Sequence, residues 1–202
     1  MGDPAKNLFI DYETYRTLEE ASDTKHEWYD GVIYAMSGGT LAHGALGGAC
    51  VAELRALVRS CGCQTFTSDV KVRVLATGIA TYPDVSVACG ELQTDPADRT
   101  ALTNPSLIVE VLSDATEAYD RGEKFAHYRQ LPSLRDYVLV SQHEPRIEVF
   151  SRDGERWMLT VAHAGERAPL TAFAGALDVD RVYEGVTLEP RAARGTEPSP
   201  GR

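Results

Sequence analysis

The sequence predicts an α/β protein in which helices cover a mixed α+β sheet, and two patterns support this prediction. Short runs rich in Val, Ile, Thr and aromatic residues alternate with longer segments whose apolar residues recur every three or four positions. The first pattern is typical of strands and the second of amphipathic helices. The core order that results is helix, three strands, helix, strand.

The chain is expected to open with a short helix and a hairpin. Residues 12–21 have helical character, and Asp30-Gly31 separates two apolar-rich runs in EWYDGVIYAM. An Asp-Gly pair in this setting is the strongest short-range hairpin signal. Residues 40–59 then repeat apolar side chains at helical spacing before Gly62, so the first long helix is expected there.

The remaining core elements follow from apolar runs and helix signals. Three strands are predicted at 65–75, 84–89 and 107–112, then a helix that Asp120 can cap and Pro132 ends, and a fourth strand at 136–141.

The last segments are predicted to form a hairpin and a tail. Strands at 146–151 and 157–161 flank an Asp153-Gly154 turn. Residues 187–202 carry Pro, Gly, Glu and Arg without an apolar period, so we expect them to be disordered. One domain is therefore expected over residues 1–186.

Composition narrows the class of protein. The 202 residues are 43% hydrophobic and 25% charged, which is ordinary for a globular protein, and no apolar run approaches a membrane span of about 18–20 residues. The N-terminal residues lack the pattern of a secretory signal, so we expect a cytoplasmic protein. A net charge of −10 argues against broad adhesion to nucleic acid, unless the acidic residues lie away from the binding cleft or a bound metal adds positive charge.

The four cysteines admit two interpretations. Cys50, Cys61, Cys63 and Cys89 could be zinc ligands, but no CxxC pair or nearby His pair accompanies them. We expect free, buried thiols.

A carboxylate interrupts the most apolar predicted strand. LIVEVL is typical of a strand covered on both faces, and Glu110 lies within it. A buried carboxylate must take up a proton or find a cation, because desolvation costs several kcal/mol. Asp84 can meet Glu110 if their strands pair, and hard oxygen ligands then favour Mg²⁺ or Mn²⁺. The alternative is a structural pair between Glu110 and a Lys or Arg.

Lys124 follows on the next predicted helix, where it shares a face with Tyr128. A lysine near a helix N-terminus is usually solvated. Beside Asp84 and Glu110, however, its ammonium could orient a water or stabilise charge in the transition state.

The segments YPDVSV, SLIVEVLS, DRGEKFAHYRQL and RDYVLV resemble the Uma-type family of restriction-endonuclease-like proteins over roughly residues 10–185. That family is placed in the PD-(D/E)XK nuclease superfamily, so the resemblance implies a restriction-endonuclease-like core. By position, Asp84 in Pro83-Asp84 matches its Pro-Asp element, and Glu110 matches the acidic residue of its E-x-K element. Leu112 stands where the usual lysine would follow. The resemblance implies that Lys124 supplies that ammonium from the helix.

Three further residues match or approach family positions. Glu27 could be a third acidic group near the metal or a hairpin residue, and His43 could touch a substrate phosphate or cap the first long helix. Glu53 is the other candidate for an acidic residue on that helix.

Three functions remain open at this point. The first is metal-dependent hydrolysis of DNA, with Asp84 and Glu110 as metal ligands and Lys124 assisting. The second is a non-catalytic binding or regulatory module, which the absence of lysine at position 112 permits. The third is a phosphodiesterase acting on RNA or a small nucleotide, which suits the acidic charge better. A homodimer through the 146–161 hairpin is also expected, because duplex cleavage calls for two sites and an unpaired strand edge invites pairing.

Overall fold

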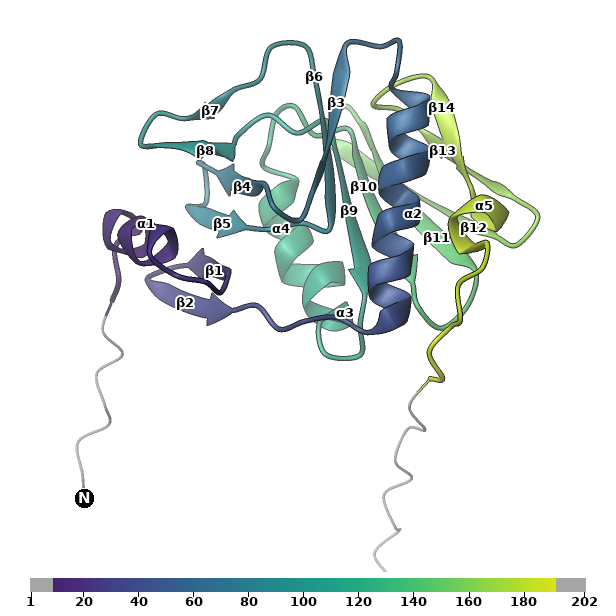
Figure 1. Cartoon of the computed structure of the whole chain (residues 1–202). Helices are drawn as coiled ribbons and strands as arrows, with labels where there is room; N and C mark the ends of the chain where they lie inside the picture. The colour runs from purple at the N-terminus through teal and green to yellow at the C-terminus, as the bar shows by residue number, and fades with distance from the viewer. Residues whose placement is uncertain (1–8, 192–202) are drawn as a thin grey trace, which may run out of the picture.

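The computed structural model describes residues 9–191, which are built around two six-stranded sheets (Figure 1). The core sheet has the order β12-β11-β10-β9-β6-β3, and the second sheet has the order β2-β1-β5-β4-β8-β7. In chain order the elements are α1 (Tyr12–Glu20), β1 (His26–Tyr29), β2 (Val32–Ala35), α2 (Leu41–Leu57), β3 (Cys63–Thr67), β4 (Lys71–Val74), β5 (Ile79–Thr81), β6 (Val85–Cys89), β7 (Thr94–Asp95), β8 (Asp98–Leu102), β9 (Leu107–Leu112), α3 (Glu117–Tyr119), the π-helical turn η1 (Asp120–Lys124), α4 (Phe125–Tyr128), β10 (Asp136–Ser141), β11 (Arg146–Asp153), β12 (Arg156–His163), β13 (Arg167–Leu170), β14 (Gly175–Asp178) and α5 (Val179–Tyr183).

The core sheet is mixed, as predicted. Strands β9 and β10 pair in parallel, whereas β6 pairs with β9, and β10 with β11, in antiparallel fashion. A parallel neighbour requires a crossover connection. Here the crossover consists of α3, η1 and α4, which therefore lie against the sheet next to β9.

Helices and strands cover both faces of the core sheet, which explains the uninterrupted apolar pattern around Glu110. One face packs against α2, α5 and the β13–β14 hairpin, through residues such as Leu46, Leu54 and Val182. The other face packs against α4 and the second sheet, through residues such as Tyr128 and Val72. Figure 1 shows α2 in front of the sheet and the α3–α4 crossover behind it.

Both predicted hairpins form, with different loop residues. Asp30 and Gly31 make the first loop with φ of 48° and 80°, the left-handed geometry that Asp-Gly accommodates. In the second hairpin Asp153 pairs with Arg156, so the loop is Gly154-Glu155 and only Gly154 has positive φ. The predicted turn is therefore displaced by one residue.

The strand predicted at 65–75 is wrong as a single element. It divides at Ser68-Asp69 into β3 of the core sheet and β4 of the second sheet. The Asp69 carboxylate accepts a hydrogen bond from the Thr67 hydroxyl at 3.0 Å, which stabilises the turn. The strands β5, β7, β8, β13 and β14 were not predicted. All but β8 have two to four residues, which is too few to establish a period of two.

The second helix also begins earlier than predicted. Thr116 is its N-cap residue, and Asp120 lies inside the helix with its side chain buried beside Lys124. The prediction that Asp120 caps the helix is therefore wrong. Its carboxylate instead lies 3.7 Å from Nζ of Lys124, four residues further along the helix.

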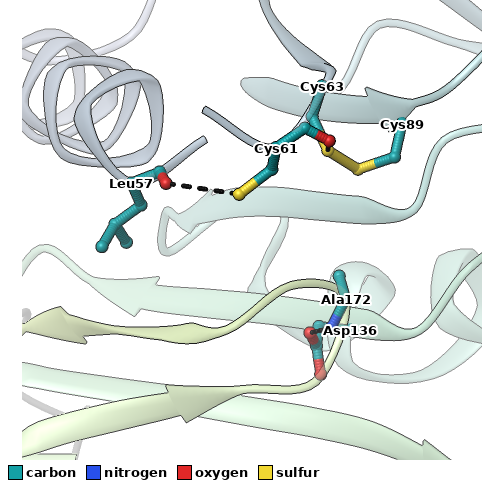
Figure 2. Close-up of a disulfide and its surroundings, with 6 residues drawn as sticks. All are labelled: Leu57, Cys61, Cys63, Cys89, Asp136 and Ala172. Carbon is teal, nitrogen blue, oxygen red and sulfur yellow. Dashed lines mark hydrogen bonds between the residues drawn. A yellow bond between two sulfur atoms is a disulfide. The ribbon is translucent and has the colours of Figure 1, made fainter. Parts of the chain in front are cut away.

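The cysteine prediction holds for Cys50, which is buried and free, but is wrong for the other three. Cys61 is exposed, and Cys63 forms a disulfide with Cys89 (Figure 2). These two residues are register partners on β3 and β6, with Cα atoms 3.9 Å apart. Spacing along the chain does not reveal such a cross-strand pair.

The structure also corrects part of the predicted disordered tail. Val186 and Leu188 pack against the core, and the Glu189 amide donates to the Gln142 carbonyl at 2.9 Å. Residues 187–191 are thus held in place, whereas 192–202 lie outside the described residues. Within residues 9–191, no helix is long and apolar enough to cross a membrane.

Candidate active site

A cleft of about 1310 Å³ opens between the N-terminal half of α2, the β1–β2 hairpin and the segment after β9. Its lining includes the predicted site residues Glu27, His43, Asp84, Glu110 and Lys124. On the α2 side, the cleft is lined by three glycines, Gly44, Gly47 and Gly48. The cleft is therefore open to a large ligand along that helix.

Strand pairing brings Asp84 to Glu110, as the alternation of side chains predicted. Val85 lies opposite Val109 in the antiparallel ladder, so Asp84, one position earlier, faces Glu110 across the end of the pairing. The Val111 amide donates a hydrogen bond of 2.7 Å to Asp84 Oδ2. This contact holds the Asp84 carboxylate at the point where β9 enters the cleft.

Lys124 is the immediate partner of Glu110. Its Nζ lies 3.0 Å from Glu110 Oε1, and the Tyr128 hydroxyl donates to the same oxygen at 3.0 Å. Nζ is also 3.2 Å from Glu27 and 3.7 Å from Asp120. One buried ammonium therefore stands among three carboxylates, which is the structural pairing that sequence reasoning had left open beside a metal.

Burial and charge act in opposite directions at this cluster. Burial raises the pKa of Glu110 well above its ordinary value, and it also raises the pKa of Asp120. Burial alone would disfavour the ammonium of Lys124, but Glu110 and the neighbouring carboxylates outweigh it and raise the pKa of Lys124. The cluster keeps more carboxylates than cations, so a further cation beside Glu110 would be stabilised.

His43 lies on the first turn of α2, on the opposite wall of the cleft from Lys124. Its Nε2 is 3.4 Å from Asp84 Oδ2, and this contact raises the pKa of His43. The helix is capped by Thr40, whose hydroxyl accepts the His43 amide at 3.1 Å. The expectation that His43 could cap the helix is therefore wrong, and its side chain instead positions Asp84.

The two remaining acidic candidates separate clearly. Glu27 lines the cleft, contacts Lys124 and accepts the Tyr82 amide at 3.2 Å. Glu53 lies on α2 but pairs with Arg181 of α5 at 3.6 Å and is absent from the described lining of the cleft. Of the two, only Glu27 belongs to the cluster.

The oxygen atoms at the site suit a hard divalent cation. The contacts of Asp84 and Glu110 within residues 9–191 use Oδ2 and Oε1, which leaves Oδ1 and Oε2 for another ligand. No group of three or more His, Cys, Asp or Glu side chains in the described chain is arranged to enclose a metal. An ion bound there would have only Asp84 and Glu110 as carboxylate ligands, with water or substrate completing its coordination, as is common for Mg²⁺.

Sequence reasoning missed several cleft or cluster residues. Asp120 had a usable signal, because it precedes Lys124 by four positions on one helix. Gln142 and His143, which follow β10, had no such signal. The Thr40 hydroxyl donates to Gln142 Oε1 at 2.8 Å, and His143 Nε2 lies 2.9 Å from Asp114 Oδ1.

A mixed sheet with a crossover helix, and an acidic residue just before one strand facing another on the neighbouring strand, agree with the restriction-endonuclease-like fold expected from the sequence. A family model described as "Uma2: Putative restriction endonuclease" matches residues 12–180, and the chain belongs to this family. The crystal structure of a "putative nuclease belonging to DUF820" from Anabaena variabilis superposes with a TM-score of 0.66 at 16% identity, covering 80% of this chain and 91% of that one.

Two relatives from Synechocystis sp. align with most of this chain. The uncharacterized protein slr1290 is 38% identical over 187 residues, which is 87% of this chain and 92% of the relative. The uncharacterized protein sll1609 is 31% identical over 156 residues, covering 77% and 88% respectively. The similarity thus extends over nearly the whole of both relatives.

Proposed function

We propose that this protein is a divalent-metal-dependent endonuclease that hydrolyses DNA phosphodiester bonds. The observation that supports the proposal best is the convergence of Asp84, Glu110 and Lys124 in one cleft. Asp84 lies just before β6, Glu110 on β9 and Lys124 on the crossover helix, and the cleft leaves room for a ligand beside them.

Each residue has a distinct role in this proposal. Asp84 and Glu110 would hold Mg²⁺ or Mn²⁺ through their unengaged oxygens, and the ion when bound supplies Lewis-acid activation of water and of the phosphoryl group. Lys124 keeps its proton at Nζ and would stabilise the negative charge that grows on the phosphoryl oxygens. His43 and the Val111 amide orient Asp84.

The charge of the cleft favours a second candidate substrate. Among its described residues, eight carboxylates oppose the ammonium groups of Lys25 and Lys124: Asp23, Glu27, Asp84, Glu110, Asp114, Asp120, Glu123 and Glu189. Such a lining disfavours a long polyanion and is better suited to RNA ends or small nucleotides that approach a bound metal. A non-catalytic binding or regulatory module, the remaining candidate, would bind nucleic acid without metal-dependent turnover.

Cleavage assays with purified protein test the reaction. We expect nicking of plasmid or single-stranded DNA with Mn²⁺ or Mg²⁺, and its loss in Asp84→Ala. Lys124→Ala should bind metal but lose most of the rate, because its ammonium acts mainly in the transition state. Glu53→Ala, outside the cleft, is the matched control and should keep the activity. Equal cleavage by Asp84→Ala would assign the activity to a contaminant, whereas faster turnover of RNA or small nucleotides would select the second substrate class.

Metal binding can be measured without a substrate. At 100 times the dissociation constant, Mn²⁺ should stabilise the native state by about 2.7 kcal/mol. For a chain of this size the melting temperature should rise by about 5–11 °C. Glu110→Gln should lose most of this shift, and Glu53→Gln should retain it. A full shift in Glu110→Gln would place the metal elsewhere.

The cytoplasmic location and the homodimer expected from the sequence belong to the same proposal. Cutting both strands of a duplex is simplest with two symmetric sites.

A further inference from the structure

Strand β12 presents an open edge at the end of the core sheet. It pairs with β11 through eight consecutive register pairs without a bulge, and in the described chain no strand pairs with its outer side. Natural edges are usually protected by Pro, Lys, bulges or shortness. Residues 156–163 contain neither Pro nor Lys, and eight residues are long for an edge strand.

The edge is also apolar. Leu159 is 51% exposed, Val161 41% and Met158 58%. Because side chains alternate along a strand, Trp157, Leu159 and Val161 share one face, and Met158 and Thr160 share the other. Trp157, Leu159 and Val161 form the apolar stripe. The ring centroids of Trp157 and Phe125 are 5.2 Å apart, and the Arg152 guanidinium carbon lies 4.6 Å from the Trp157 centroid, so the Trp157 end of the stripe is packed against the fold.

We propose that β12 pairs antiparallel with β12 of a second copy of this chain, with Leu159 opposite its own symmetry mate. This register sets Trp157 of each copy opposite Val161 of the other, and Met158 opposite Thr160. Apolar side chains then face apolar side chains on the exposed stripe. Such directly opposed pairs are the unit of sheet stabilisation.

Charge at the two ends of the strand supports the same occupant. In this register Glu155, the loop residue just before β12, lies opposite His163, the last residue of β12 in the other copy, so an acidic residue meets a histidine twice across the twofold axis. A strand whose side chains are complementary to their own reversed order fits a second copy better than an unrelated partner. The pairing would join two core sheets into one of twelve strands. It gives the homodimer of the proposed function a specific strand and register, and its test does not require the proposed reaction.

Sedimentation velocity over micromolar to millimolar concentrations tests the pairing. Wild type should pass from the 22.0 kDa monomer to twice that mass. Leu159→Lys places two ammonium groups opposite each other and should weaken the dimer by about tenfold or more. Met158→Lys is similarly exposed but faces Thr160, so it should dimerise nearly as wild type does. Melting curves check that both variants fold.

A covalent readout tests the register itself. The exposed thiol of Cys61 is first removed by Cys61→Ser, so that it cannot form crosslinks of its own. In that background Leu159→Cys should oxidise to a disulfide-linked dimer, and Met158→Cys should do so much less. Wild type that stays monomeric throughout, equal loss of dimer in both lysine variants, or equal crosslinking of both cysteine variants would each overturn the proposal.

Discussion

Replacing Lys124 by methionine is expected to lower the free energy of unfolding by about 3–5 kcal/mol, which is the usual cost of removing one partner of a buried ion pair. The substitution keeps the aliphatic volume but leaves Glu110, Glu27 and Asp120 without their shared cation. The melting temperature should fall by about 6–20 °C. Glu110→Gln should cost less, because Lys124 then retains two carboxylates.

The pH dependence of this loss has a defined sign. Burial raises the pKa of Glu110 above 4.5 even beside Lys124, whose ammonium acts in the opposite direction. Without that ammonium the pKa of Glu110 rises further, so the folded variant is favoured most where Glu110 carries a proton. The deficit relative to wild type should be small below pH 4.5 and should grow as the pH rises through the raised value. Saturating Mn²⁺ at neutral pH should recover part of it, because the ion replaces the missing charge.

Calorimetry in the presence of a chelator measures these differences. Lys25→Met is the matched control, since Lys25 lines the same cleft but is only half-buried and pairs with the exposed carboxylate of Asp69. Exposed pairs contribute about 0–1 kcal/mol, so this variant should melt near wild type. A loss in Lys124→Met as small as that in Lys25→Met would contradict the prediction, because the buried cluster would then not depend on its ammonium.

Reduction of the Cys63–Cys89 disulfide is the second change expected to have a large effect. The bond closes a loop of 26 residues, and constraining a loop of this length in the unfolded chain contributes about 3–4 kcal/mol. Adding a reductant should therefore lower the melting temperature by about 6–16 °C. The double variant Cys63→Ser/Cys89→Ser should melt low in both conditions.

Cys61→Ser provides the control, because this exposed thiol is outside the bond and its variant should respond to reductant as wild type does. Identical melting with and without reductant would show that the thiols are not joined in solution. The same measurement bears on location, since disulfides persist in oxidising compartments and are rare in a reducing cytoplasm. Alkylation of protein taken directly from cells would count the free thiols there.

Local patterns were sufficient for the elements that carry the core. The apolar run around Glu110 predicted a strand covered on both faces, and the structure places helices and a second sheet over it. Asp30-Gly31 predicted the first hairpin because its φ values are a property of two adjacent residues. The pairing of Asp84 with Glu110 followed from period-two alternation once their strands were neighbours.

Contacts between distant segments could not be read in this way. Lys124 meets Glu27 and Glu110 because three elements converge, and its choice of partners depends on packing rather than spacing. Glu53 resembled Glu27 as a candidate, yet α5 supplies Arg181 and draws it away from the cleft. Cys63 and Cys89 are joined by the register of two strands, which no single segment encodes. Periodicity determines which face a side chain takes, whereas its neighbour across that face is set by how the whole chain folds.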